Sequence, residues 1–133
     1  TDLAGELAGA RSLLESAGIA VTTIAEAGPL PPAVARSLAW VVREGTTNVL
    51  RHASATTVQL ALTRDDAGIT LTITNDGAPA DPPATGSGLA GLSERLDEVG
   101  GTLGSQPRDG RWILTARVDA DALARLDTAG SQS

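Results

Sequence analysis

Lysine, cysteine, methionine, phenylalanine and tyrosine are all absent from this chain of 133 residues. Without cysteine, the chain has no disulfide, no thiolate metal site and no cysteine nucleophile. Without lysine, it cannot form a Walker-type phosphate loop, because that loop requires Gly-Lys-Ser/Thr. Trp40 and Trp112 are the only aromatic residues. The core must therefore be built from Leu, Val, Ile and Ala.

The charge balance is acidic, with 16 Asp and Glu residues against 10 basic residues and a formal net charge of −6. No cluster of positive charge is present, so we expect no nucleic-acid partner. No apolar run reaches the roughly twenty residues of a transmembrane helix, and no signal peptide is visible. The chain is long enough for one domain with its own core. We expect a soluble, cytoplasmic domain, processed or excised from a longer protein because it begins without Met.

Hydrophobic periodicity predicts three helices and five strands. The helices are expected at 2–17, 32–53 and 87–99, and the strands at 19–24, 56–63, 68–75, 102–105 and 111–118, with one more short helix in the tail. Turns are expected at 64–68 and 107–110. This order predicts an α+β fold, a two-layer α/β sandwich whose mixed, mainly antiparallel sheet is covered by helices on one face.

The longest predicted helix carries a carboxylate and a carboxamide one turn apart. Glu44 and Asn48 are i and i+4, so both side chains project from one side of the helix. Mg²⁺ takes hard oxygen ligands and usually keeps several waters, which suits a carboxamide oxygen from Asn48 with water-mediated help from Glu44. The alternative is a solvated Glu beside a mid-helix Asn. Arg51 lies on the same stripe, where it either reaches a phosphate or is a surface arginine.

His52 is the only histidine in the chain. It projects toward the middle of the apolar arc of the predicted helix, where a histidine is more often a hydrogen-bonded packing residue. A single histidine cannot form a catalytic pair with another, so a packing role and a ligand-binding role both stay open.

Asp76 and Gly77 follow a strand whose alternate residues are apolar. A carboxylate at such a strand end can accept a hydrogen bond from an exocyclic amine, for which the amino group of a purine is one candidate. Gly77 permits a close approach or a positive φ. The alternative is a plain turn, because Asn-Asp-Gly is also a strong turn sequence.

A glycine-rich run, Gly86-Ser87-Gly88-Leu89-Ala90-Gly91, opens the third predicted helix. Its glycine spacing matches the dinucleotide fingerprint, but the run does not follow a strand, so a Rossmann interpretation fails. The backbone N–H groups at a helix start can nevertheless cradle an anion. The alternative is a flexible linker.

These segments together are more specific than any one of them. The motifs follow one another in a set order: Arg43-Glu44, Thr47-Asn48 and Arg51-His52-Ala53 on the helix, then Asp76-Gly77, then Gly86-x-Gly88-Leu89-x-Gly91-Leu92. In this order they resemble the GHKL ATPase superfamily, and the resemblance covers roughly residues 3–118. Within it, the chain is most similar to the catalytic ATP-binding domain of bacterial sensor histidine kinases, in the branch of the nitrate/nitrite sensors and DesK-like sensors.

The resemblance implies a Bergerat-type ATP-binding fold and a role for each matching residue. Asn48 would be the Mg²⁺ ligand, Glu44 the acidic residue that positions the metal, Asp76 the group that recognises the adenine amine, and Gly77 the residue that lets the base approach. Arg51 and His52 match a basic pair near the phosphates, and residues 78–87 an ATP lid. The phosphates would be faced by Gly86, Ser87, Gly88, Leu89 and Gly91. The final hairpin, with Asp109-Gly110, departs from the glycine and threonine usual there.

The resemblance also implies a larger parent protein. Residues 1–17 would be a linker from a dimerisation and phosphoacceptor domain, 18–118 the catalytic domain and 119–133 a tail. The partners implied are ATP, that phosphoacceptor domain and a response regulator. The isolated domain would be a monomer that binds ATP without autophosphorylating, and the parent a homodimer that is either soluble or membrane-anchored.

Two alternatives stay open. One is a serine kinase of the anti-sigma type on the same fold, which the linker-like first helix disfavours. The other is a non-catalytic interaction module on a degenerate GHKL fold. A hydrolysing ATPase of the gyrase type is disfavoured because no transducer domain follows.

Overall fold

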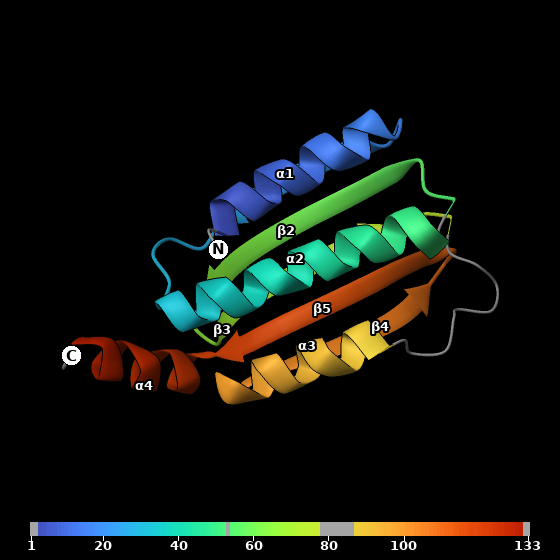
Figure 1. The fold of residues 1–133 in the computed structure, drawn as a ribbon. Coiled ribbons are helices and arrows are strands. Elements are labelled where there is room, and N and C mark those ends of the chain that lie inside the picture. Colours follow the sequence, from blue (N-terminus) through green and yellow to red (C-terminus); the bar gives the residue numbers. More distant parts are fainter. Residues whose placement is uncertain (1–2, 53, 78–86, 132–133) are drawn as a thin grey trace.

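The computed structural model describes residues 3–52, 54–77 and 87–131 and contains four helices and five strands in that part of the chain (Figure 1). In chain order the elements are α1 (Leu3–Ser16), β1 (Ala20–Glu26), α2 (Pro32–His52), β2 (Thr57–Asp65), β3 (Gly68–Asn75), α3 (Ser87–Glu98), β4 (Gly101–Arg108), β5 (Arg111–Asp119) and α4 (Ala120–Ser131). Each described helix is too short or too polar to traverse a lipid bilayer.

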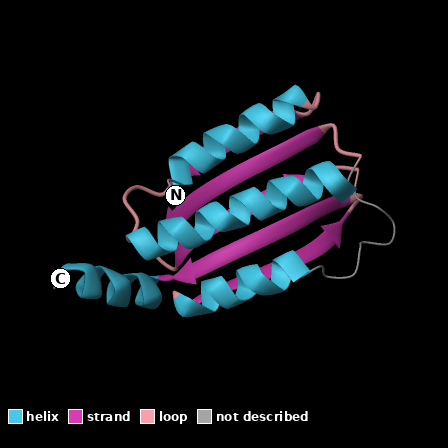
Figure 2. Ribbon diagram, in the orientation of Figure 1, coloured by secondary structure: helices cyan, strands magenta, loops and turns pink. Residues whose placement is uncertain are grey.

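The five strands form one sheet in the order β1-β2-β3-β5-β4. β1 and β2 run parallel, and the other three neighbouring pairs are antiparallel. Helices α1, α2 and α3 lie side by side over one face of the sheet, whereas α4 lies beyond one end of it (Figure 2). This arrangement confirms the predicted two-layer fold with a mixed, mainly antiparallel sheet.

The core lies between the helices and the sheet because one side of each central strand is apolar. On β3 the buried residues alternate, with Ile69, Leu71 and Ile73 facing the helices. The same face of β2 carries Val58, Leu60 and Leu62. Helix α2 covers these residues with the predicted apolar arc, of which Val34, Leu38, Val41, Val42 and Val49 are buried. Ala53, the last predicted member of the arc, lies outside the described residues.

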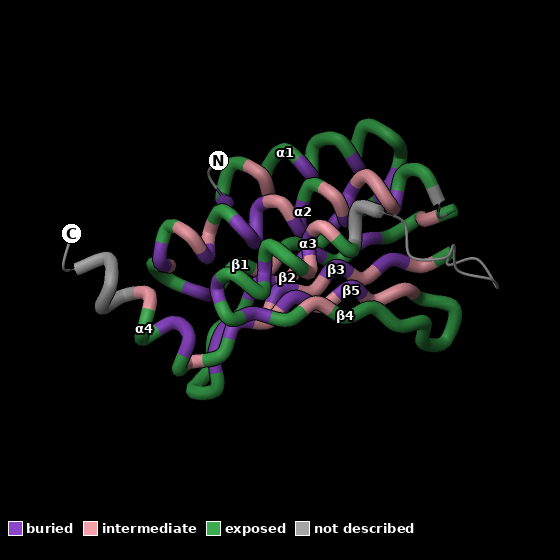
Figure 3. Tube along the Cα trace, turned by 60° about the horizontal axis from the view of Figure 1, so that its bottom comes forward, coloured by how far each residue is buried: buried purple, intermediate pink, exposed green. Residues whose placement is uncertain are grey.

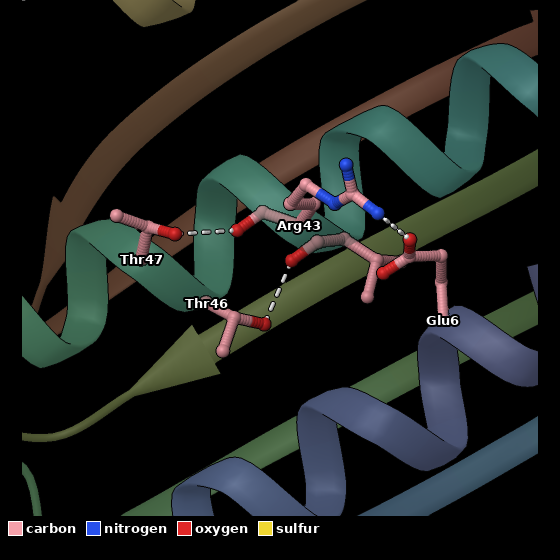
Figure 4. Close-up of polar contacts among 5 residues, drawn as sticks. Glu6, Arg43, Thr46 and Thr47 are labelled. Atoms are coloured by element: carbon pink, nitrogen blue, oxygen red, sulfur yellow. Dashed lines mark hydrogen bonds and ion pairs between the residues drawn. The ribbon is translucent and has the colours of Figure 1, made fainter.

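Helix α1 shares this core. Its buried residues Leu3, Ala10 and Leu14 belong to the same hydrophobic cluster as residues of α2 and the sheet. Figure 3 shows the buried stretches of these elements in purple. On the outer surface, the Arg43 side chain donates a hydrogen bond to Glu6 at 2.6 Å, which ties α2 to α1 (Figure 4).

The last hairpin is longer than the sequence pattern predicts. The first strand was expected over 102–105 with a turn at 107–110, but β4 continues through Pro107 to Arg108. The turn is only Asp109-Gly110, both with positive φ, which is the geometry of a two-residue hairpin. In such a hairpin the closing pair Arg108 and Arg111 exchange hydrogen bonds, so the nitrogen of Pro107 faces the free edge. An edge strand tolerates proline there because no neighbour needs its N–H.

Candidate functional site

The segments that the sequence singled out meet at one end of the molecule. The C-terminal half of α2, the end of β3, the start of α3 and the β4–β5 turn all lie at that end (Figure 1). They are far apart in the sequence, and they converge because α2 and β3 run in one direction while α3 and β5 run in the other. The end of β3 and the start of α3 therefore border the same region as Glu44 and Asn48.

Gly45 fixes the position of α2 above this end of the sheet. A Cβ at Gly45 would lie 2.5 Å from Cδ1 of Ile73 and 3.2 Å from Cδ2 of Leu114, so the helix sits close against β3 and β5. Glu44 directly precedes Gly45 and Asn48 follows it by three residues, and both side chains are half-buried. Arg51, one turn further on, is exposed. The three side chains keep the predicted order along α2.

The threonines between Glu44 and Asn48 bond within the helix. Thr46 Oγ1 donates to the Val42 carbonyl oxygen at 2.7 Å, and Thr47 Oγ1 donates to the Arg43 carbonyl oxygen at 3.0 Å (Figure 4). Such bonds satisfy the hydroxyl groups of threonines inside a helix. No described residue bonds the Glu44 carboxylate or the Asn48 carboxamide, so these two groups are the ones open to a ligand in this stretch.

Asp76 is engaged by the α2–β2 connection. Its Oδ1 accepts the backbone N–H groups of Thr56 at 2.7 Å and Thr57 at 2.9 Å, and its Oδ2 accepts the Thr56 hydroxyl in a short hydrogen bond. The Thr56 hydroxyl, followed by the two backbone N–H groups, lowers the pKa of Asp76 from 3.8 to about 2. Each of these bonds favours the ionised form. The adenine-recognising role of Asp76 stays a prediction, and three of the lone pairs of its carboxylate are already used.

Gly77 approaches the backbone of the same connection. Its φ is +66°, and a Cβ there would overlap the Ser54 carbonyl group. The Ser54 N–H donates to the Gly77 carbonyl oxygen at 3.2 Å. Only glycine tolerates both this φ and so little space. The close approach that the sequence predicts at Gly77 is therefore made by the backbone of Ser54.

The glycine-rich run is described in part. α3 begins at Ser87, which places its first backbone N–H groups at the site end of the molecule, where an anion is favoured. Around Gly91 there is open space, with nothing within 4 Å of a Cβ. Gly86 lies outside the described residues, as do the side chains of His52, Ser87 and Leu89. The predicted roles of these residues, and of Gly88, stay predictions.

Two residues at this end received no functional role from the sequence. Asn75 is 3% exposed and lies on the helix-covered face of β3, in phase with Leu71 and Ile73. Trp112 is its partner on β5 and is half-buried. Extending the alternation of Ile69, Leu71 and Ile73 by one more step would have placed Asn75 inside and Asp76 outside.

The oxygen donors at this end fit a hard cation held mainly by phosphates. In the described ranges, no three His, Asp or Glu side chains gather into a metal site. Asn48 offers one carboxamide oxygen, and Glu44 lies one turn before it. Mg²⁺ typically takes only one or two ligands from the protein and completes its shell with phosphate and water. Glu44 and Asn48 are therefore compatible with a nucleotide-bound Mg²⁺ ion.

The comparison with protein families identifies this arrangement. The model of the histidine kinase-like ATPase domain matches residues 8–122, which is most of the chain. This chain belongs to the histidine kinase-like ATPase domain family. The resemblance seen in the sequence motifs is thereby confirmed at the level of the family.

Individual proteins that are similar to this chain are histidine kinases as well. The sensor histidine kinase YxjM of Bacillus subtilis (strain 168) is 34% identical over 73 residues, 55% of this chain and 18% of that protein. The histidine kinase domain of the blue-light activated histidine kinase of Erythrobacter litoralis EL346 has a TM-score of 0.77 at 19% identity, covering 93% of this chain and 66% of that one. Histidine kinase ThkA, solved in complex with the response regulator TrrA, has a TM-score of 0.68 at 14% identity, covering 90% and 40%.

The region that matches this chain is a small part of the length of the curated relatives. The chain spans less than a fifth of the length of those it matches, 18% in one and 13% in another. The solved structures, below 25% identity, establish the fold.

Proposed function

We propose that this ATPase domain binds Mg²⁺-ATP and is the catalytic part of a two-component sensor histidine kinase. The reaction would break the bond between the γ-phosphorus and its bridging oxygen in ATP and form a bond from that phosphorus to a histidine nitrogen, releasing ADP. The histidine would lie on a separate dimerisation domain. The observation that carries the proposal is the convergence of Glu44, Asn48, the end of β3 and the start of α3 at one end of a histidine kinase-like ATPase domain.

The residues of the chain would act by positioning and by electrostatics, which supply most of the catalysis in phosphoryl transfer. Asn48 would hold the metal with its carboxamide oxygen, and Glu44 would orient it through water. Arg51 and the α3 backbone N–H groups would hold the phosphates, together with His52 and the run from Gly86 to Gly91. When bound, Mg²⁺ neutralises phosphate charge. The end of β3, with Gly77, would form the base end of the site.

The partners follow from the same assignment. We expect the domain to act on a phosphoacceptor histidine of a homodimeric parent, whose phosphoryl group then passes to a response regulator in the cytoplasm. Helix α1 would lead from the dimerisation domain. Because Leu3, Ala10 and Leu14 of α1 are buried in the common core, a movement of the linker would displace side chains that pack against the sheet and α2. By itself the domain would be a monomer and would not autophosphorylate.

The test is a calorimetric titration of the domain with ATP and ADP, with and without Mg²⁺. We expect saturable binding that Mg²⁺ strengthens. Asn48→Ala should remove the strengthening by Mg²⁺, because it deletes the protein ligand of the ion. We expect the affinity for the nucleotide in the presence of Mg²⁺ to fall on the order of 10- to 100-fold. Thr47→Ala is the matched control, since the Thr47 hydroxyl bonds the Arg43 carbonyl within the helix and should leave binding unchanged.

Absence of nucleotide binding under every condition would overturn the proposal and favour a non-catalytic interaction module. Equal Mg²⁺ dependence in the wild type and Asn48→Ala would leave nucleotide binding in place and show that the metal is held elsewhere.

A further inference from the structure

A pocket of about 380 Å³ opens at the end of the molecule opposite to the candidate functional site. The start of α1, the end of β1, the connection from β1 to α2 and the start of α2 meet there (Figure 1). We call it the α1–α2 pocket. Its four leucines are Leu3 and Leu7 of α1, Leu30 of the connection and Leu62 of β2. Sites of about 300–1,000 Å³ typically hold small molecules, so the α1–α2 pocket has the size of a compact one.

The α1–α2 pocket has a buried floor and incompletely covered walls. Leu3 and Leu62 are buried in the hydrophobic core, whereas Leu7 and Leu30 are half-buried. An apolar group that covers these walls would remove more apolar surface from water, which favours binding in proportion to the area covered. Among the described residues that line the pocket, no side chain is aromatic and every side chain but one is apolar. The lining therefore matches an aliphatic body that carries few polar groups.

The exception in the lining is Arg36, which begins the second turn of α2 and is exposed. In the described ranges, no carboxylate lies within ion-pair distance of its guanidinium. Glu6, next to Leu7 on α1, is instead bound by Arg43 at 2.6 Å. The first turn of α2 carries no acidic residue, so the positive end of the helix dipole adds to the charge of Arg36. The rim is thus positive in a chain whose formal net charge is −6.

We propose that the α1–α2 pocket is a binding site for a small aliphatic carboxylate. The aliphatic chain lies against Leu7, Leu30 and Leu62, and the carboxylate pairs with Arg36. A guanidinium forms charge-assisted, often bidentate hydrogen bonds with a carboxylate, which is why this anion suits the rim. The pocket is lined from two helices, two strands and a connection, and this concave shape suits a small molecule better than an extended polypeptide.

The α1–α2 pocket is separate from the candidate functional site. Arg36 and Asn48 both lie on α2, twelve residues apart, which is roughly 18 Å along the helix axis. The two sites can therefore be occupied at the same time, and this inference does not depend on the proposed nucleotide-binding function. A bound aliphatic chain would contact α1, β2 and the β1–α2 connection at once, and would stabilise the packing of α1 on the rest of the domain.

The experiment is a calorimetric titration of the chain with octanoate, 1-octanol and butyrate. 1-Octanol keeps the aliphatic chain of octanoate and lacks its charge, whereas butyrate keeps the charge and has half of the carbon atoms. We expect saturable binding of octanoate, about tenfold tighter than that of either control ligand. 1-Octanol loses a charge-assisted hydrogen bond, and butyrate loses apolar contact.

Three variants locate the bound ligand. Arg36→Gln should lower the affinity for octanoate about tenfold and leave that for 1-octanol unchanged, because it removes only the charge. Arg125→Gln, an exposed position on α4, is the matched control and should change neither affinity. Ala25→Phe places a ring in the pocket from β1 and should abolish binding of both ligands. Ala25 and Arg36 are exposed, so both variants should fold, which circular dichroism checks.

The outcomes decide the ligand and the site separately. Equal affinity of the wild type for octanoate and 1-octanol, or equal octanoate affinity in the wild type and Arg36→Gln, would overturn the assignment of a carboxylate ligand. Absence of saturable octanoate binding, unchanged binding in Ala25→Phe, or displacement of octanoate by Mg²⁺-ADP would overturn the site. If the chain binds no nucleotide, the proposed function fails, and the octanoate titrations still decide this inference.

Discussion

Asp76 shows how one side chain can hold a strand end in place. Its carboxylate gathers the Thr56 hydroxyl and the N–H groups of Thr56 and Thr57, so the strand end and the α2–β2 connection are held together. Gly77 allows the chain to pass close to Ser54 at the same place. These contacts fix the end of β3 relative to the end of α2.

The lowered pKa of Asp76 predicts a specific pH dependence. A carboxyl group with a folded pKa of about 2 against an ordinary 3.8 stabilises the fold while it is ionised. This contribution is fully present above about pH 4 and is lost as the pH falls through about 2. We therefore expect the difference in Tm between the wild type and Asp76→Asn to be largest above pH 4 and to shrink between pH 4 and 2, as measured by circular dichroism.

Thr56→Val provides the matched comparison, because it removes the hydroxyl donor and keeps both backbone donors. It should lower the Tm less than Asp76→Asn does, with the same trend toward low pH. A difference between the wild type and Asp76→Asn that is constant from pH 6 to 2 would contradict the assigned hydrogen bonds.

At the scale of elements, the three covering helices are tied together on their outer surface by Trp40. The guanidinium of Arg43 lies 5.0 Å from the ring centroid and that of Arg95, on α3, lies 4.7 Å from it. Arg43 also bonds Glu6 on α1 at 2.6 Å. These contacts connect α1 through α2 to α3, whose start lies at the same end of the molecule as the candidate site.

A double-mutant cycle should detect this link. We expect Trp40→Leu and Arg95→Gln to be coupled by about 0.5–1 kcal/mol in the free energy of unfolding, the usual value for an exposed cation–π pair. Denaturation in urea of the four proteins measures it. A cycle of Trp40→Leu with Arg117→Gln is the control, because Arg117 bonds Thr70 on the face of the sheet away from α2. Additive effects for Trp40 and Arg95 would show that the stacked geometry contributes nothing.

At the scale of the whole molecule, one layer of core joins all the parts of the site. α1, α2, α3 and the sheet share a single hydrophobic cluster, which also includes Ala122 and Leu123 of α4. A domain of this kind is expected to unfold in one cooperative transition. A ligand that binds only the folded state must then stabilise every element at once.

Nucleotide should accordingly raise the stability of the entire domain. Mg²⁺-ADP at about one hundred times its Kd should add about 2.7 kcal/mol to the free energy of unfolding. Urea denaturation followed by circular dichroism and by tryptophan fluorescence should give one coincident transition, shifted upward by the ligand. Separate transitions for the two signals, or a shift seen in only one of them, would show that α1 or α3 unfolds independently of the sheet.

Much of the fold could be predicted from local pattern. Alternation in β3 and the apolar arc of α2 define buried faces by themselves, because the periods of 2 and 3.6 residues depend only on backbone geometry. The family could also be predicted, since Glu44, Asn48, Asp76 and the glycine-rich run occur in a characteristic order. The length of β4 could not, because Pro107 signals a turn unless the strand is known to lie at an edge.

The tertiary structure decided what the side chains at the strand end do. Sequence alone placed a carboxylate at Asp76, at the end of β3, and predicted that it accepts a hydrogen bond from an exocyclic amine. Which of Asn75 and Asp76 faces the helices depends on the phase of β3 within the sheet and on donors from Thr57 and Thr56, nineteen and twenty residues away from Asp76 in the chain. Hydrogen bonds over such separations exist only once β2 and β3 are paired, and for this reason the folded sheet settled the direction of the Asp76 carboxylate.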